Sequence, residues 1–196
     1  MLLHNPSLTL QPLTPDRWPD LERLFGPRGA CAGCWCTWWR LSSSDFDRGK
    51  GDGNRAALKA LVDAGDPPGL LAYAASDPVG WVSLGPRERF PRLARSRVLA
   101  PVDDRPVWSI VCFFMRRDHR RHGLLPTLID GAVDYAAARG AAAVEAYPID
   151  PAAGRRTADA FAYTGFASAF LTAGFVEVLR RSPTRPIMRY TIDPAH

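Results

Sequence analysis

Residues 116–122, near the middle of the chain, read RRDHRRH and are followed directly by a glycine. They separate an apolar run, VWSIVCFFM, from a segment whose apolar residues recur at helical spacing. A loop between a strand and a helix points unpaired backbone amides, and the positive end of the helix dipole, beyond the strand tip. Gly123 allows a tight turn and a close approach to the main chain. These residues predict an anion site of the phosphate-binding kind.

The loop carries neither of two familiar phosphate-binding motifs, G-x-x-x-x-G-K-[ST] and G-x-G-x-x-G. Arg120, Arg121 and His122 nevertheless add charge where the backbone already favours an anion. A solvated arginine-rich turn and a nucleic-acid surface are the alternatives. The local residues favour a diphosphate cradle.

Composition limits the classes of partner. The net charge of +5 favours anionic partners, but the arginines are scattered over loops and form no long basic stripe. We therefore expect no nucleic acid. The longest apolar runs are too short to span a bilayer, and MLLHNPSLTLQPL lacks the basic start and long apolar core of a signal peptide. The chain is expected to be cytoplasmic and to have no membrane partner.

The four cysteines could be metal ligands or core residues. Cys31, Cys34 and Cys36 are close together, whereas Cys112 stands alone in an apolar run. A structural zinc site usually takes two separated pairs of ligands, and no second pair is present. We expect no metal, and reduced thiols that pack beside Trp35 and its neighbouring tryptophans.

Hydrophobic periodicity predicts an alternation of strands and helices. The expected strands are residues 7–14, 69–75, 79–85, 107–115, 142–150, 175–181 and 186–192, and the expected helices begin at Pro15, Asn54, Leu124 and about Ser168. Thr14 is the expected cap of the first helix. Two segments lack periodicity. Residues 26–54 are expected to form a long irregular stretch, and residues 86–106 an excursion over the surface.

The resulting fold class is α/β, with a mixed, mostly antiparallel central sheet and flanking helices in one domain, 1–196. FFMRRDHRRHGLLPTLID resembles the central motif of the GNAT superfamily of acyl-CoA-dependent N-acetyltransferases. That motif runs strand, [QR]-x-x-G-x-[GA], helix, and here it reads Arg120 to Leu125, with leucine in the last place. AFLTAGF is similar to the family's C-terminal L-Y-x-x-x-G-F pattern, with Phe170 in the tyrosine's place. The resemblance covers most of the chain and implies a sheet whose central strands splay apart.

The resemblance also implies how acetyl-CoA would bind as co-substrate. The backbone of the strand end would pair with the pantetheine arm like an added strand, and the amides of Arg121 to Leu125 would hold the diphosphate. Arg116, Arg117 or Arg120 would reach the ribose phosphate. The cofactor-binding residues predicted are Phe113, Phe114, Met115, Arg120, Arg121, His122, Gly123, Leu124, Leu125 and Thr127.

Three residues are candidates for proton transfer in such an enzyme. Glu145 is the only carboxylate on an apolar strand next to the cofactor strand, so it is the candidate base. The alternative is an inert carboxylate bonded to an arginine such as Arg40. Phe170 cannot donate a proton, so Tyr163 and Ser168 are the candidate acids by proximity in sequence, and solvent is the alternative.

The sequence therefore predicts transfer of an acetyl group from acetyl-CoA to a primary amine, by direct attack in a ternary complex. The expected partner is a small-molecule or peptide amine, and homodimerisation is left open. The aromatic CWCTWWR segment and residues 86–106 are the expected acceptor-binding regions. A catalytically degenerate CoA sensor is the rival, because the usual tyrosine is missing.

Overall fold

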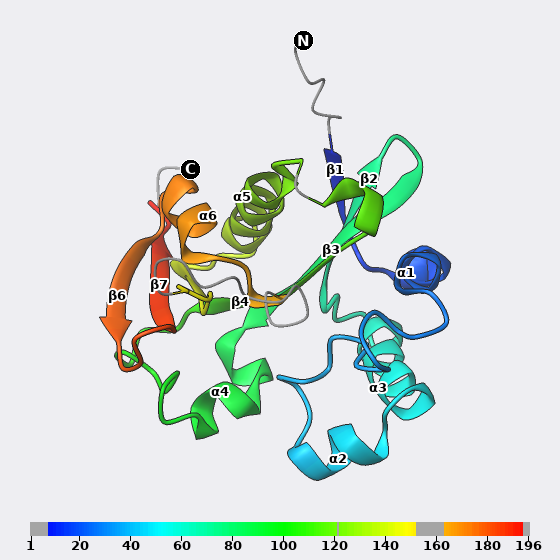
Figure 1. Cartoon of the computed structure of the whole chain (residues 1–196), viewed down its shortest axis with the longest axis horizontal. Helices are drawn as coiled ribbons and strands as arrows, with labels where there is room; N and C mark the ends of the chain where they lie inside the picture. The colour runs from blue at the N-terminus through cyan, green and yellow to red at the C-terminus, as the bar shows by residue number, and fades with distance from the viewer. Residues whose placement is uncertain (1–7, 121, 152–162, 194–196) are drawn as a thin grey trace.

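A computed structural model describes residues 8–120, 122–151 and 163–193 of the chain. Its strands form one seven-stranded sheet in the order β1-β2-β3-β4-β5-β7-β6 (Figure 1). The strands are β1 (Leu8–Pro12), β2 (Gly69–Ala74), β3 (Asp77–Pro86), β4 (Trp108–Met115), β5 (Ala143–Ala146), β6 (Val176–Arg180) and β7 (Pro186–Thr191). All neighbours in this sheet pair antiparallel except β4 and β5, which are parallel. The predicted mixed, mostly antiparallel sheet is confirmed.

Helices cover both faces of this sheet (Figure 1). They are α1 (Trp18–Phe25), α2 (Ser43–Arg48), α3 (Asp52–Asp63), α4 (Pro91–Arg95), α5 (Leu124–Ala137) and α6 (Ala167–Thr172), with short 3-10 turns η1 (Pro15–Arg17), η2 (Arg87–Arg89) and η3 (Arg117–His119). Leu128 and Ile129 of α5 pack on one face together with Phe170 of α6. Leu21 of α1 and Leu58 of α3 pack on the other face. We call these the α5 face and the α1 face.

The strands β4 and β5 separate after a short parallel contact. Their pairing covers only Trp108 to Ile110 on β4, which face Val144 to Ala146 on β5. Two features explain the separation. On its other edge β4 carries a bulge, because Ser83 pairs with Cys112 and Leu84 with Ile110, so Val111 has no partner across the ladder. After β5, Pro148 cannot donate a hydrogen bond that would extend the ladder. The sheet is therefore splayed at its centre.

Three local predictions were wrong or only partly right. The first concerns residues 26–54, which are not wholly irregular. They contain α2, where the Ser42 hydroxyl accepts from the Asp45 amide as a helix cap, and the first residues of α3. The second concerns Thr14, which stands at the N-cap of η1 as predicted but makes no capping hydrogen bond through its side chain. That side chain instead accepts a hydrogen bond from Arg17 at 2.7 Å.

The third concerns residues 86–106, which do not simply cross the surface. The segment includes η2 and α4, and the side chains of Phe90, Leu93 and Leu99 are buried in the core on the α1 face. Their spacing follows short turns rather than a long helix, so no apolar stripe reveals them in the sequence. The segment is anchored against the sheet beside the splayed strands.

Candidate functional site

The loop from β4 to α5 has the geometry of an anion cradle. Gly123 immediately precedes α5 and has a left-handed backbone, with φ +71°. A side chain at Gly123 would meet nothing within 4 Å, so the space beside this turn is open. The first amides of α5 have no partner within the helix and point the positive end of its dipole to that space. These features fit a diphosphate at residues 122–125, while Arg121 of the predicted cradle lies outside the described residues.

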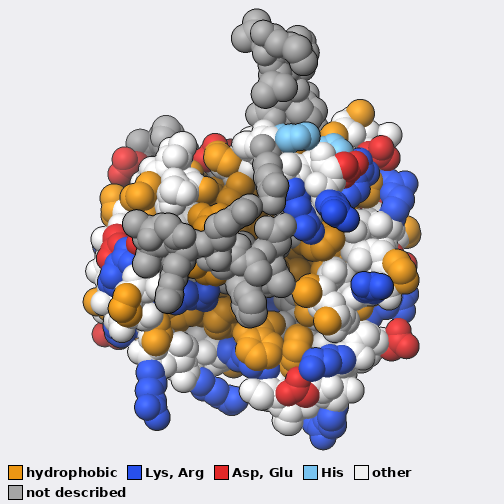
Figure 2. Space-filling view, in the orientation of Figure 1, with side chains coloured by type: hydrophobic (Ala, Val, Ile, Leu, Met, Phe, Trp, Pro, Cys, Tyr) orange, Lys and Arg blue, Asp and Glu red, His pale blue; other side chains and the backbone are white. Residues whose placement is uncertain are grey.

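Charged side chains gather around this loop. Figure 2 shows basic side chains and histidines together on the surface beside it. Within the group, Arg116 pairs with Asp118 at 2.8 Å, and Arg120 donates from Nε to the Met115 carbonyl at 2.9 Å. The exposed Arg117 makes no ion pair within the described part of the chain. Of the three arginines predicted to reach a ribose phosphate, Arg117 has the fewest competing contacts.

The splayed edge of β4 leads from this loop into the molecule. Phe113 turns to the α5 face, where its ring lies 6.0 Å from that of Phe170. Phe114 turns to the α1 face and contacts Phe25, with ring centroids 5.3 Å apart. Both side chains are thus held in the core. The β4–β5 ladder ends at Ile110, so the main chain of Phe113 and Phe114 does not pair with β5. An extended group can add to such an edge as a further strand, which fits a pantetheine arm.

Glu145 lies on β5 opposite Ser109 and is almost wholly buried, with 1% of its surface exposed. Its Oε1 accepts from Arg189 Nη2 at 2.7 Å, and its Oε2 accepts from the Tyr147 hydroxyl at 2.9 Å and from Arg87 Nη1 at 3.3 Å. Both oxygens are therefore already occupied by donors. These contacts favour the structural alternative over the role of base, although the arginines are Arg87 and Arg189 rather than Arg40.

The polar network around Glu145 was not predicted from the sequence. The Tyr147 hydroxyl lies 2.8 Å from Ser109 Oγ and also accepts from Arg87. Burial raises the pKa of Tyr147 well above its ordinary value. Arg189 also holds Asp103 with two hydrogen bonds of 2.7 and 3.0 Å. The network thus joins β4, β5, β7 and the segment before β4.

The two candidate acids have different surroundings. Tyr163 is half-buried on the α1 face, against the core cluster that contains Cys112 of β4. Burial raises the pKa of Tyr163, so its phenol keeps its proton at neutral pH. Ser168 is exposed at the start of α6. Phe170, at the family's tyrosine position, is fully buried and packs against Phe175 with ring centroids 5.1 Å apart. Tyr163 is thus the more buried of the two hydroxyl groups.

The cysteines are free thiols of unequal exposure. Cys31 is exposed, whereas Cys36 is buried with its sulfur 3.0 Å from that of Cys112. The hydrogen bond with Cys112, helped by burial, raises the pKa of Cys36 well above its ordinary value. Within the described residues, no three His, Cys, Asp or Glu side chains are grouped so as to hold a metal ion.

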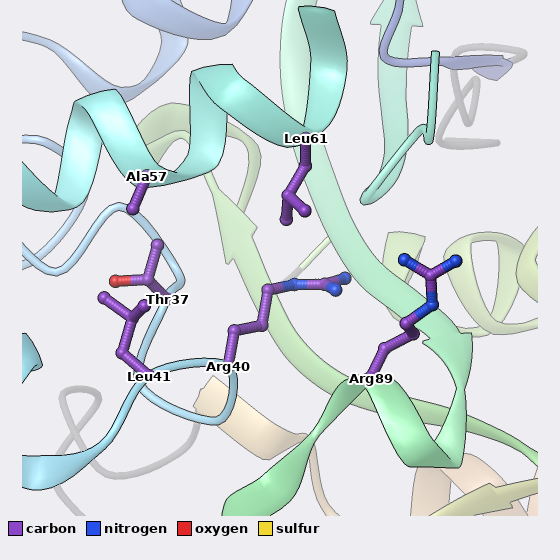
Figure 3. A pocket seen from close by; sticks show the side chains of 6 residues that line it. All are labelled: Thr37, Arg40, Leu41, Ala57, Leu61 and Arg89. Carbon is purple, nitrogen blue, oxygen red and sulfur yellow. The ribbon is translucent and has the colours of Figure 1, made fainter. Parts of the chain in front are cut away.

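Arg40 lines a small recess on the outer side of the α1 face. The recess has a volume of about 140 Å³ and is lined by Thr37, Arg40, Leu41, Ala57, Leu61 and Arg89 (Figure 3). Arg40 donates to the Pro68 carbonyl at 2.9 Å and lies 4.4 Å above the Phe90 ring. Burial lowers its pKa to about 10, so Arg40 stays charged at neutral pH. Arg40 also donates to the Leu84 carbonyl of β3 at 3.3 Å, so its contacts join the start of β2 to β3 and to residues 86–106.

Comparisons with known proteins agree with this geometry. The model of the acetyltransferase (GNAT) family matches residues 35–166, more than half of the chain. No curated protein matches the sequence. Among solved structures, a PaiA N-acetyltransferase of Thermoplasma acidophilum in complex with coenzyme A is similar over 95% of this chain and 99% of its own, with 13% identity and a TM-score of 0.52.

Two further solved structures have the same fold. A putative arylalkylamine N-acetyltransferase 7 from the yellow fever mosquito is 12% identical, with a TM-score of 0.57 over 95% of this chain and 88% of its own. A GNAT-family acetyltransferase from Streptococcus agalactiae is 10% identical, with a TM-score of 0.56 over 95% and 96%.

The mixed seven-stranded sheet with its flanking helices matches the fold of these acetyltransferases. The chain belongs to the acetyltransferase (GNAT) family. Membership in this family implies binding of an acyl-CoA and transfer of its acyl group. No helix in the described part of the chain has the length and apolar character needed to cross a membrane.

Proposed function

We propose that the protein transfers an acetyl group from acetyl-CoA to the primary amine of a small molecule or peptide. Two observations carry the proposal: the open turn at Gly123 before α5, and the end of the β4–β5 ladder at Ile110, which leaves the rest of that edge of β4 without a β5 partner. The first amides of α5 and the cradle residues, including His122, Leu124, Leu125 and Thr127, would hold the diphosphate. The main chain of Phe113 to Met115 would align the pantetheine arm, so that the thioester lies near the bulge at Val111.

The reaction needs little chemistry from the protein beyond positioning. The amine nitrogen bonds to the carbonyl carbon, the carbon–sulfur bond breaks, the amine loses a proton and the departing thiolate gains one. Within this proposal Tyr163 donates the proton to sulfur, because its protonated phenol lies beside the core cluster of Cys112. Exposed Ser168 remains the second candidate. Solvent can accept the amine proton, because both oxygens of Glu145 are engaged.

The rival function is a CoA sensor without turnover, which the phenylalanine at position 170 favours. The two functions are separated by incubating the protein with acetyl-CoA and a panel of primary amines, while release of the free thiol is followed. The enzyme releases thiol faster with at least one amine than with none. The sensor shows a rise in melting temperature with acetyl-CoA, through mass action, but no such acceleration.

Tyr163 is tested in the same assay. Tyr163→Phe should lower turnover about 10- to 100-fold, within the range of general acid catalysis, and leave the dissociation constant for CoA unchanged. Tyr73→Phe is the matched control, because the Tyr73 hydroxyl donates to Asp20 at the far end of β2. Equal turnover of the two variants would exclude Tyr163 as the donor.

A further inference from the structure

Two buried sulfur atoms are in contact although their residues lie 76 positions apart in the chain. Cys36, in the segment between α1 and α2, has its Sγ 3.0 Å from the Sγ of Cys112 on β4. Both side chains are buried and both thiols are free. The contact is only about 1 Å longer than the S–S bond of a disulfide. A small movement is therefore enough to join the two sulfurs.

The backbone around Cys36 is held in a conformation that costs energy. Trp35 and Cys36 have φ values of +44° and +52°, in the left-handed region that residues with a Cβ atom rarely adopt. Of the five such residues in the described part of the chain, four lie between positions 30 and 36. Strain of this kind persists only where the surroundings impose it, and it is concentrated at functional sites. The strain marks the turn at Cys36 as a candidate site.

Contacts on both sides of Cys36 fix its position against β4. The Trp35 ring stacks on a tryptophan of α1, with ring centroids 5.9 Å apart. The Thr37 hydroxyl donates to the Cys34 carbonyl at 2.9 Å. Cys112 is also fixed, because it lies within the ladder between β3 and β4. Holding two reacting groups at contact distance raises their effective concentration, which favours a bond between them.

A third cysteine gives small reagents access to the buried pair. Cys34 precedes Cys36 by two residues and is only half-buried. A hydrogen bond with the Cys36 thiol, together with burial, raises the pKa of Cys34 well above its ordinary value. The three sulfurs thus form a row from the partly exposed turn to Cys112 on β4. A reagent that cannot reach the pair can react with Cys34 first.

We propose that Cys36 and Cys112 are a redox site, which a small disulfide oxidises to an intramolecular disulfide with Cys34 as the relay. The Cys34 thiolate attacks the small disulfide, forms a mixed disulfide and releases one small thiol. Cys36 then attacks the Cys34 sulfur and releases the second small thiol. Finally, Cys112 attacks the Cys36 sulfur, and Cys34 returns to its thiol. In sum, two cysteine thiols lose two electrons and two protons, which the small disulfide gains.

The disulfide would tie the segment between α1 and α2 to the centre of the sheet. Cys112 directly follows Val111, the residue at the bulge of β4. The inference does not rest on the proposed acetyl transfer, because no step of the oxidation needs acetyl-CoA. The substrate of this site is a small disulfide rather than an amine.

The test counts free thiols in buffers of known redox potential. The reduced protein is equilibrated with mixtures of oxidised and reduced glutathione, quenched with acid, alkylated in denaturant and weighed by mass spectrometry. The number of alkylated cysteines should fall from four to two as oxidised glutathione increases, and digestion should yield a peptide pair linked through Cys36 and Cys112. Four alkylated cysteines in every mixture, also after refolding from urea in the same mixtures, would overturn the site. A link through Cys31 instead would overturn it as well.

Single replacements separate the roles of the cysteines. Cys31→Ser is the matched control, because Cys31 is exposed in the same segment, and this variant should form the same link at the same rate. Cys34→Ser should reach the same final state at least about 10-fold more slowly, since the relay is lost. Cys112→Ala should form no link to β4. An unchanged rate for Cys34→Ser would remove Cys34 as the relay.

The disulfide should also be visible in thermal unfolding. It joins residues 76 positions apart and so restricts the unfolded chain. The oxidised protein should therefore melt at least about 5 °C above the reduced protein, whereas Cys112→Ala should melt at one temperature in both buffers. A linked protein that melts below the reduced one would show that the sulfurs must leave their native positions to bond. That result would overturn the argument from their contact.

Discussion

Glu145 is the residue whose chemistry depends most on its surroundings. A buried carboxylate near the cofactor strand can serve as a base, but here four donor groups surround its two oxygens. Its partner Arg189 is 44 residues away in the chain, so sequence spacing could not reveal the pair. The sequence alone left two roles open for Glu145, a catalytic base or a partner in a buried ion pair. The contacts favour the ion pair.

The two roles of Glu145 predict different results for Glu145→Gln. Removing one partner of a buried ion pair should cost about 3–5 kcal/mol of the free energy of unfolding. Turnover of the folded variant should fall less than about 10-fold, with an unchanged pH profile. Urea unfolding and thiol release measure the two quantities. Glu177→Gln breaks an exposed pair with Arg180 and should cost less than about 1 kcal/mol. A loss of turnover of about 100-fold or more, at ordinary stability, would make Glu145 the base.

Among the elements, the long periodic helix α5 was predictable, whereas the short helices α2 and α4 were not. α5 begins at Leu124, where the pattern placed it, because its buried residues repeat every three or four positions over 14 residues. The helices α2 and α4 span only six and five residues, which is too short for periodicity to appear. The splay follows from a bulge at Val111, and a bulge depends on the partner strand as much as on its own residues.

The segment before β4 is tied to the sheet through Asp103. Arg189 lowers the pKa of Asp103 by hydrogen bonding to its charged form. A carboxyl whose pKa is lower in the folded state than in the unfolded state stabilises the fold at pH values above its unfolded pKa of about 3.9. This stabilisation is lost as the pH falls through the pKa of the folded state. The urea midpoint of Asp103→Asn should therefore lie below that of the wild type at pH 7, and the gap should shrink as the pH falls below about 4. An equal difference in urea midpoint between the variant and the wild type at neutral pH and at a pH of about 2.5 would contradict the pairing of Asp103 with Arg189.

For the molecule as a whole, the proposed function is divided between the two faces of the sheet. The diphosphate is proposed to bind at the turn before α5, and the proposed proton donor Tyr163 packs against the core cluster on the α1 face. The order of strands and helices made the family recognisable from the sequence, and the fold confirms it. Tyr163 could be named from the sequence only by its proximity to the last helix, because its packing against the α1-face cluster depends on the fold.

The central claim is that the turn at Gly123 binds the diphosphate, and calorimetric titration with CoA tests it most directly. Gly123 and Gly140 lie just beyond the two ends of α5, with φ values of +71° and +77° and no atom within 4 Å of an added Cβ. Glutamate at either position therefore brings the same backbone strain and the same charge. Gly140→Glu should bind CoA within about threefold of the wild type, whereas Gly123→Glu should lose at least about 100-fold through repulsion of the diphosphate. Equal dissociation constants for the two variants would contradict the account.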